Sequence, residues 1–447
     1  MWNRIMIENE PRQTNSQETR KIQMTLEGRG SYEDWTFAKA DTSYLTHKLH
    51  DYPARMIPQI SQRLIDRYSP KRGKILDPFC GSGTTLVEAR FANRNAVGND
   101  INPLAVLIAK VKSTPINFID VGFDASEFFS VIQREYVQAK KNGKLPEPPT
   151  HLLPNLLHWF KEPVARDLEF LYENIIHIEN KDIQDFLKVI FSDTVFKTSN
   201  IDHRSSRFIR TLHKEELGKF RPNVLEHFHR KLFDSVARML QYSRRLRELN
   251  IDDDLLITVR KGDARELPVP DNEFDAAITS PPYGEEKNTV GYIRWSKLSI
   301  AWLRLNSHEL KECEKRTLGA TGIKNTLEQL DELPSPTALK ILKEVAKTDS
   351  GRIKDALPFF FDYLRTLEEV YRVLKPRSFY CIVIGDRSIR KKLLDMEKIT
   401  VELGNAAGFK HVQSFFRKIP MKLIPWSTPT GKTISRESIV ILQKDGC

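Results

Sequence analysis

Short apolar runs closed by turn residues fill the first and last parts of the chain. Seven of them have the length of strands: Lys74–Asp77, Ala96–Asp100, Leu255–Val259, Phe274–Thr279, Phe379–Ile384, Val412–Phe416 and Ser438–Leu442. A helix-compatible segment separates the first two runs, which is the alternation typical of a parallel sheet. The amphipathic stretch Phe361–Leu374 stops at Lys375-Pro376, because proline ends a helix. The pattern therefore predicts an α/β fold with a seven-stranded sheet.

The alternation of strand-like runs and helix-compatible segments stops between about residues 113 and 252. Apolar residues recur three and four apart from Ile183 to Phe191 and from Leu225 to Met239, which predicts amphipathic helices, and a weaker pattern surrounds Leu168 and Leu171. The proline-rich stretch 142–154 predicts a loop. The expected organisation is an N-terminal arm at 1–41, a sheet domain made of 42–112 and 253–447, and a mainly helical insertion at 113–252.

A glycine-rich turn follows the first predicted strand directly. The run from Asp77 to Thr85 reads Asp-Pro-Phe-Cys-Gly-Ser-Gly-Thr-Thr. Two glycines two apart let the backbone turn tightly beside a ligand, and the next helix points free N–H groups at it. The run matches neither the Walker A loop nor Gly-x-Gly-x-x-Gly, which disfavours triphosphates and dinucleotides. Asp100 ends the next strand, 23 residues after Asp77. A carboxylate there can accept both ribose hydroxyl protons, so the spacing indicates an adenosine.

A second group of residues ends the strand Phe274–Thr279. Ser280-Pro281-Pro282-Tyr283 lies at the carboxyl edge of the predicted sheet, beside the glycine turn. The Ser280 hydroxyl and the rigid Pro281 carbonyl can accept hydrogens from a planar exocyclic amine, and Tyr283 offers a ring face for stacking. Asp263, at the end of the preceding strand, can accept from an adenine amine. These residues predict a pocket for an amine-bearing ring.

Taken together, these residues resemble the exocyclic-amine DNA methyltransferases that use S-adenosylmethionine. Residues 77–85 are similar to motif I of that family, Asp100 to the motif II acid, Asp263 to motif III and Ser280 to Tyr283 to the catalytic motif IV. The segment Thr46–Arg55 resembles motif X, which closes over the methionine end of the cofactor. The likeness spans about 42–112 and 253–444. Cofactor contacts are thus expected at Tyr52, Pro53, Ala54, Asp77, Phe79, Gly81, Ser82, Gly83, Thr84, Asp100 and Asp263.

The resemblance implies a Rossmann-like methyltransferase sheet and a reaction on DNA. Serine at the first position of Thr-Ser-Pro-Pro-Tyr is the form that the family associates with cytosine N4, whereas aspartate or asparagine is common in adenine N6 enzymes. No Pro-Cys pair occurs, which excludes the cysteine nucleophile of cytosine C5 methylation. The expected function is site-specific cytosine-N4 methylation of double-stranded DNA in restriction and modification, with a cognate endonuclease as companion. Adenine-N6 methylation is the alternative, and RNA base methylation and a silent DNA-binding subunit are more distant ones.

The order of the motifs leaves the target-recognition region open. The long insertion precedes motif III, unlike the order of other groups in the family, so both the insertion and the polar stretch 284–355 are candidates for reading the target.

Charge adds a candidate DNA contact. The chain carries 70 Lys and Arg against 59 Asp and Glu, a net charge of +11, which favours a polyanionic partner. Twelve of these cations and only four acids lie between Arg204 and Arg247. A base-flipping enzyme must grip phosphates, so this segment is a candidate for that task. The proposed contacts are Arg204, Arg207, Arg210, Arg244, Arg245 and Arg247.

The cysteine, histidine and apolar patterns bear on whether the protein has a metal site, a disulfide framework or a membrane segment. The four cysteines form no Cys-x-x-Cys pair, and the histidines between 203 and 229 have no metal-ligand spacing, so neither a metal site nor a disulfide framework is expected. No apolar run reaches 18 residues, and the first residues are polar with mixed charge. We therefore expect a cytoplasmic protein without a membrane segment.

Overall fold

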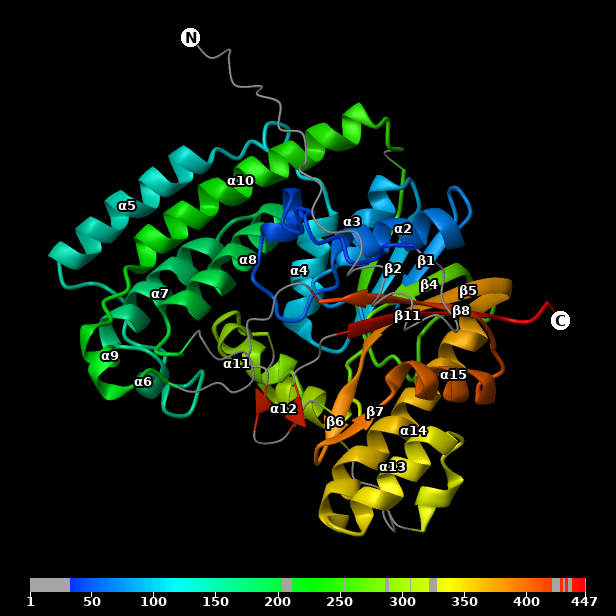
Figure 1. Ribbon diagram of the computed structural model, residues 1–447. Coiled ribbons are helices and arrows are strands. Elements are labelled where there is room, and N and C mark those ends of the chain that lie inside the picture. The colour runs from blue at the N-terminus through cyan, green and yellow to red at the C-terminus, as the bar shows by residue number, and fades with distance from the viewer. Residues whose placement is uncertain are drawn as a thin grey trace, which may run out of the picture.

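The computed structural model describes residues 33–202, 211–252, 254–285, 289–305, 307–320, 328–419, 427–428, 431–432 and 436–446. Its centre is a seven-stranded sheet in the order β3-β2-β1-β4-β5-β11-β8 (Figure 1). The strands are β1 Lys74–Asp77, β2 Asn95–Asp100, β3 Ile257–Lys261, β4 Phe274–Thr279, β5 Leu374–Gly385, β8 Lys410–Lys418 and β11 Arg436–Gln443. The first five are parallel, and β11 runs antiparallel to both β5 and β8. This arrangement confirms the predicted Rossmann-like sheet.

Alternating side chains give the sheet two buried faces. Ile75 and Ile439 pack into one apolar cluster, whereas their neighbours Leu76 and Val440 pack into another on the opposite side. This is the two-residue period of a strand buried on both faces. The helices that contact the strands are α2 Pro58–Tyr68, α3 Thr84–Phe91, α4 Pro103–Ser113, α14 Ser350–Val373 and α15 Met396–Ala406.

Between α4 and β3 the described residues form six helices, which lie beyond the layer of α3 and α4 in Figure 1. They are α5 Ala125–Lys141, α6 Leu156–Trp159, α7 Glu162–Ile176, α8 Lys181–Thr198, α9 Lys214–Lys219 and α10 Val224–Glu248. The apolar faces of α5, α6, α7, α8 and α10 share one cluster with Leu104 of α4 and with Trp302 of α11, which spans Tyr292–Trp302. The ring centre of Trp302 lies 6.3 Å from that of Phe191 on α8 and 5.5 Å from that of Phe160. The helical segment is therefore packed directly onto the sheet domain.

The remaining elements are short or peripheral. The 3-10 helices are η1 Leu45–Lys48 and η3 Gln329–Glu332, and two further helices are α12 Ser307–Arg316 and α13 Pro336–Ala346. Two small hairpins join β6 Arg387–Ile389 to β7 Lys392–Leu394 and β9 Ser427–Thr428 to β10 Gly431–Lys432.

Some element boundaries differ from the sequence prediction. The third strand begins at Ile257 and continues through Lys261, because an edge strand tolerates exposed charged residues while it pairs with β2. Helix α14 begins at Ser350, where Asp349 caps it, and it includes Pro358. It ends at Val373, and β5 starts at the next residue instead of after the proline. Helix α5 has no counterpart in the sequence prediction.

Candidate active site

A pocket opens at the carboxyl ends of β1, β2 and β4, and most of the predicted cofactor residues line it. From the prediction, the lining contains Tyr52, Pro53, Ala54, Asp77, Phe79, Gly81, Ser82, Thr84, Asp100, Asp263, Ser280 and Pro282. Gly83, Pro281 and Tyr283 are not part of the lining. Parallel strands bring their carboxyl ends to one edge, which is where ligands of such sheets bind.

The glycine turn is shaped by two residues with positive φ. Gly81 has φ +49° and Gly83 has φ +83°, a backbone that favours glycine. A Cβ on Gly83 would lie 2.9 Å from the Cα and the Cβ of Ala109 on α4. Gly83 therefore brings α3 and α4 together, while Gly81 stays at the pocket surface and donates its N–H to Asp100 Oδ2 at 2.9 Å.

Two carboxylates lie at this edge without a cation, the buried Asp77 and the half-buried Asp100. Asp100 also accepts from the N–H of Asn102 at 2.8 Å, and Asp77 accepts from the Thr279 hydroxyl at 2.6 Å. Burial raises the pKa of both carboxyl groups to about 6. Among the described residues, no Lys or Arg forms an ion pair with either one. A buried carboxylate of this kind accepts hydrogen bonds from neutral donors, and the two ribose hydroxyls of an adenosine fit that requirement.

Basic groups lie at another part of the pocket, where the wall is formed by the segment that precedes α2, here called the N-terminal segment (residues 44–56). Arg55 lines the pocket and donates to the carbonyl groups of His47 and His50. The fully buried Lys112 lies with its Nζ 3.4 Å from the Oγ of Ser82. In the described part of the chain neither cation has a carboxylate within ion-pair distance. Burial lowers the pKa of Lys112 well below its usual value, because no carboxylate is close enough to offset the loss of water. The half-buried Arg55 guanidinium and the buried Lys112 amine can therefore both take a further carboxylate as partner, such as that of the amino-acid moiety of S-adenosylmethionine.

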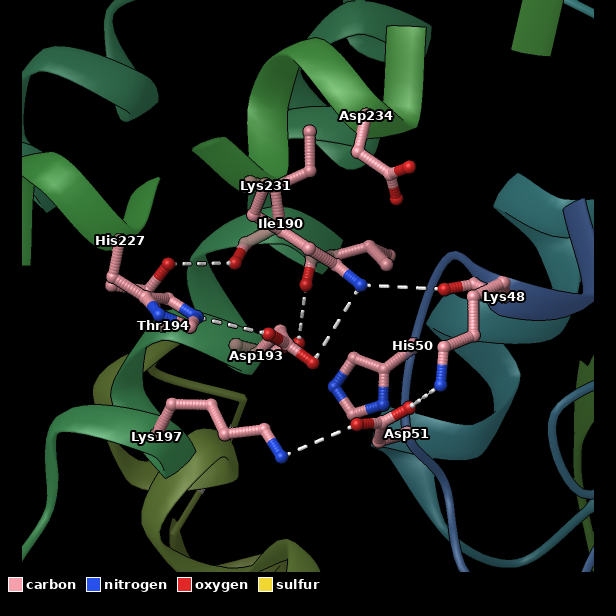
Figure 2. A network of polar contacts seen from close by, with 12 residues as sticks. Lys48, His50, Asp51, Ile190, Asp193, Thr194, Lys197, His227, Lys231 and Asp234 are labelled. Carbon is pink, nitrogen blue, oxygen red and sulfur yellow. Dashed lines mark hydrogen bonds and ion pairs between the residues drawn. The ribbon is translucent and has the colours of Figure 1, made fainter. Parts of the chain in front are cut away.

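The N-terminal segment is tied to the helical segment through a polar network (Figure 2). Asp51 pairs with Lys48 Nζ at 3.0 Å and with Lys197 Nζ of α8 at 3.2 Å. Lys231 of α10 donates to the Lys48 carbonyl at 3.3 Å and lies 3.8 Å from Asp193. The helical segment thereby holds the part of the chain that leads into Tyr52 and the pocket wall.

Asp263 lines the pocket, but two arginines already bind its carboxylate. Arg265 donates to it from its N–H and its guanidinium at 2.8–3.0 Å, and Arg316 lies 3.3 Å away. Burial acts to raise the pKa of Asp263, but the hydrogen bonds from Arg265 outweigh it and hold the pKa below its usual value. The expected acceptor for an adenine amine is therefore also the anchor of Arg316, which lines the same pocket.

The tetrapeptide Ser280–Tyr283 directly follows β4, and its residues Ser280 and Pro282 form part of the pocket wall. The Tyr283 hydroxyl donates to Glu437 Oε1 of β11 at 3.0 Å and lies 3.3 Å from the Ser280 Oγ. Ser280 thus faces the cofactor pocket, while the Tyr283 hydroxyl is directed to the neighbouring part of the sheet.

Three of the six predicted arginines belong to the described residues, and these three do not line the pocket. Arg204, Arg207 and Arg210 lie outside the described residues. The other three, Arg244, Arg245 and Arg247, are exposed near the end of α10. There, Tyr242 contacts Phe91 and the Ser113 carbonyl, at the ends of α3 and α4. Both helices run back from the carboxyl edge, so the end of α10 lies at the amino edge of the sheet, away from the pocket.

Sequence reasoning misses several pocket residues. Asn102 caps α4 and donates to the Tyr52 hydroxyl at 3.1 Å and to the Ser296 hydroxyl at 2.8 Å. Tyr292 stacks on Tyr52 with ring centres 6.1 Å apart. Asn102-Pro103, separated from Asp100 by one residue, is a helix-start signal that could have indicated Asn102, whereas no local pattern marks Tyr292 or Arg316.

We expect replacement of Asp100 by Ala to weaken S-adenosylmethionine binding by about 1 to 3 kcal/mol, because the ribose hydroxyls lose their acceptor. Titration calorimetry measures the loss. Asp254→Ala, an exposed acid next to β3, is the control and should leave the affinity unchanged. An Asp100→Ala variant with parental affinity would remove Asp100 from the site.

The raised pKa of Asp100 adds a pH dependence to the same measurement. Below about pH 6 the carboxyl group of the free protein is protonated and one of its oxygens can no longer accept a hydrogen bond. Ligand binding favours the ionised form, so affinity should fall as the pH drops through about 6, and Asp100→Asn should weaken this dependence. Asp77 titrates in the same range and should retain part of it.

Within the described residues, no group of His, Cys, Asp and Glu side chains is arranged to hold a metal ion, and no helix is long and apolar enough to cross a membrane.

The chain is similar in sequence to several known proteins. A family described as DNA methylase matches residues 2–111. The Type II methyltransferase M.MvaI of Kocuria varians is 30% identical over 91% of this chain and 93% of its own. M.BsoBI of Geobacillus stearothermophilus, also a Type II methyltransferase, is 23% identical over 86% of this chain and 84% of its own. A solved SAM-dependent methyltransferase of Methanosarcina mazei is 10% identical, covers 86% of this chain and 97% of its own, and has a TM-score of 0.30. The extended likeness to M.MvaI, together with the pocket, establishes that the chain belongs to the Type II DNA methyltransferases, which take their methyl group from S-adenosylmethionine.

Proposed function

We propose that this methyltransferase modifies the N4 amine of cytosine in double-stranded DNA. The observation that carries the proposal is the position of Ser280, which directly follows β4 and lines the same pocket as Asp77 and Asp100. A hydroxyl group at this position can accept a hydrogen from an amine that enters beside the cofactor. In the family resemblance, serine at this position accompanies cytosine N4.

The residues of the pocket have separate tasks in this proposal. Asp100 accepts from the ribose, and Arg55 and Lys112 face the carboxylate of the cofactor. S-adenosylmethionine supplies an electrophilic methyl group bound to a sulfonium sulfur. Ser280 accepts a hydrogen from the target amine, whose lone pair is otherwise delocalised into the ring, and so favours a geometry in which that lone pair can react. Holding the amine and the methyl group close together supplies much of the rate enhancement.

Which nucleic acid receives the methyl group is tested by incubating the purified chain with methyl-labelled S-adenosylmethionine and either unmodified duplex DNA or RNA. The proposal predicts label in the duplex and none in RNA. Label in RNA would favour the RNA methyltransferase alternative, and binding of DNA without any transfer would favour a silent subunit. A cognate endonuclease, the proposed companion, should cut the unmodified duplex and not the product.

We further propose that the duplex lies across the carboxyl edge of the sheet, because a flipped base must reach Ser280. Several described residues between 284 and 355 border this pocket. Tyr292 and Ile293 of α11 and residues 316–318 line the cofactor pocket, and Thr317 and Leu318 also line a second hollow beside it. Helices α8 and α10 contact Asp51 and Lys48, close to the part of the chain that forms another wall of the pocket.

Exposed cations on α11 should therefore contact phosphates. Arg294 lines the second hollow, and Lys297 lies one turn further along α11. Changing both to Gln should weaken binding to all sequences and lower the slope of log affinity against log salt by about 0.9 for each phosphate that the protein no longer binds. Binding curves at several salt concentrations measure it, with Arg244, Arg245 and Arg247 changed together to Gln as the matched comparison.

Comparing the double and triple variants distinguishes DNA bound at the carboxyl edge of the sheet from DNA bound at its amino edge. An unchanged slope for the triple variant and a lower slope for the double variant support binding at the carboxyl edge. The reverse result would place the duplex along the end of α10, at the amino edge.

A further inference from the structure

A line of polar contacts runs from the tetrapeptide into the antiparallel part of the sheet. The Ser280 Oγ lies 3.3 Å from the Tyr283 hydroxyl, which donates to Glu437 Oε1 at 3.0 Å. The other oxygen of Glu437 pairs with Arg417 Nε at 2.8 Å. Arg417 of β8 and Glu437 of β11 are direct partners in the strand register, so the ladder itself fixes this pair.

The chemistry of the three groups determines which of them donates. An ionised carboxylate can only accept, so Tyr283 must donate its hydroxyl hydrogen to Glu437. The Tyr283 oxygen is then left with lone pairs, and the Ser280 hydroxyl can donate to it. With its hydrogen directed at Tyr283, Ser280 keeps its own lone pairs for the pocket.

Burial supports this direction of donation. The Arg417 side chain is 8% exposed and the Glu437 side chain 16%, so the ion pair between them is largely shielded from water. Burial, and then the charge of Glu437, raise the pKa of Tyr283 well above its usual value. Tyr283 therefore keeps the proton that it donates.

We propose that Glu437, held by Arg417, is a positioning residue that orients the hydroxyl groups of Tyr283 and Ser280 so that Ser280 presents an acceptor to the target amine. The inference rests on the proposed role of Ser280. Without the carboxylate, the Ser280 hydroxyl could turn its hydrogen toward the pocket, where it would oppose the hydrogens of the amine. Glu437 thus acts on methyl transfer and makes no contact with the cofactor pocket.

A double-mutant cycle tests this coupling. Tyr283→Phe removes only the hydroxyl and keeps the ring, and Glu437→Gln replaces the carboxylate by an amide that can present either a donor or an acceptor. Each change should lower kcat by about tenfold, the order expected for one hydrogen bond, while the affinity for S-adenosylmethionine stays at its parental value. The double variant should also be about tenfold slower, because both changes break the same chain.

Two further variants make the cycle decisive. In a Ser280→Ala background, Glu437→Gln should cause no additional loss, because no hydroxyl remains to be oriented. Glu402→Gln is the matched control, since the Glu402 carboxylate accepts from the Ser335 and Thr337 hydroxyls far from the tetrapeptide. It should leave kcat unchanged. Thermal unfolding of each variant confirms that the fold is retained.

The outcomes separate this inference from the proposed function. Losses that multiply to about a hundredfold in the double variant, or single variants with parental kcat, would overturn the positioning role while Ser280→Ala remained defective. Parental turnover of Ser280→Ala would overturn the role of Ser280 itself, and the positioning role with it.

Discussion

Replacing Ser280 by Ala is expected to lower kcat for DNA methylation by about two to three orders of magnitude, comparable to losing one hydrogen-bonding group aimed at a transition state. The affinity for S-adenosylmethionine should stay the same, because the proposed partner of Ser280 is the target amine. Single-turnover transfer of labelled methyl groups gives the rate, and calorimetry gives the affinity.

Ser235→Ala is the control for loss of a buried serine hydroxyl. Ser235 lies on α10, away from the pocket, and its hydroxyl has no hydrogen-bond partner among the described residues. This variant should methylate DNA at the parental rate. If Ser280→Ala were equally active, the tetrapeptide would have no catalytic hydroxyl and the site would need another amine acceptor.

The second large effect is expected at Gly83. A side chain there must adopt a left-handed backbone, which costs about 1 to 2 kcal/mol, and its Cβ would approach Ala109 to 2.9 Å, which adds about 1 to 3 kcal/mol of overpacking. Gly83→Ala should therefore lower the free energy of unfolding by about 2 to 5 kcal/mol. The glycine turn has to shift to relieve the contact, so the affinity for S-adenosylmethionine should fall at least about tenfold.

Gly143 offers a matched control for Gly83. It has φ +63°, and a Cβ there would meet nothing within 4 Å. Gly143→Ala should show only the backbone cost of about 1 to 2 kcal/mol, with unchanged cofactor affinity. Denaturant unfolding and calorimetry on both variants separate strain from steric contact. Equal effects at the two positions would mean that the packing of α3 on α4 does not shape the pocket.

Local patterns explain how much of the fold and the site can be predicted from sequence. The strand ending at Asp77, the glycine turn and Asp100 are close in sequence, and each has a backbone requirement that its own residues reveal. The seven strands are predictable for the same reason, since each is an apolar run closed by turn residues. Helix α5 is absent from the sequence prediction, although Asp124 caps it and apolar residues recur three and four apart along it, at Phe128, Phe129, Ile132 and Tyr136. Its local pattern is sufficient to predict it.

The rest of the site depends on packing between distant segments. Glu437 lies 154 positions after Tyr283, and Asn102 bonds to Ser296, 194 positions away. No local pattern in the sequence connects such pairs. The charge between Arg204 and Arg247 can be counted, but only the packing of α10 on α3 and α4 shows that its last arginines lie at the amino edge.

The base that is modified tests the account most directly. Duplex DNA methylated by the purified chain is digested to nucleosides, and the products are separated and identified by mass spectrometry against authentic standards. The account predicts N4-methylcytosine, formed by the parental chain and reduced by about two to three orders of magnitude in rate for Ser280→Ala. N6-methyladenine in its place would contradict the assignment of Ser280 to a cytosine amine.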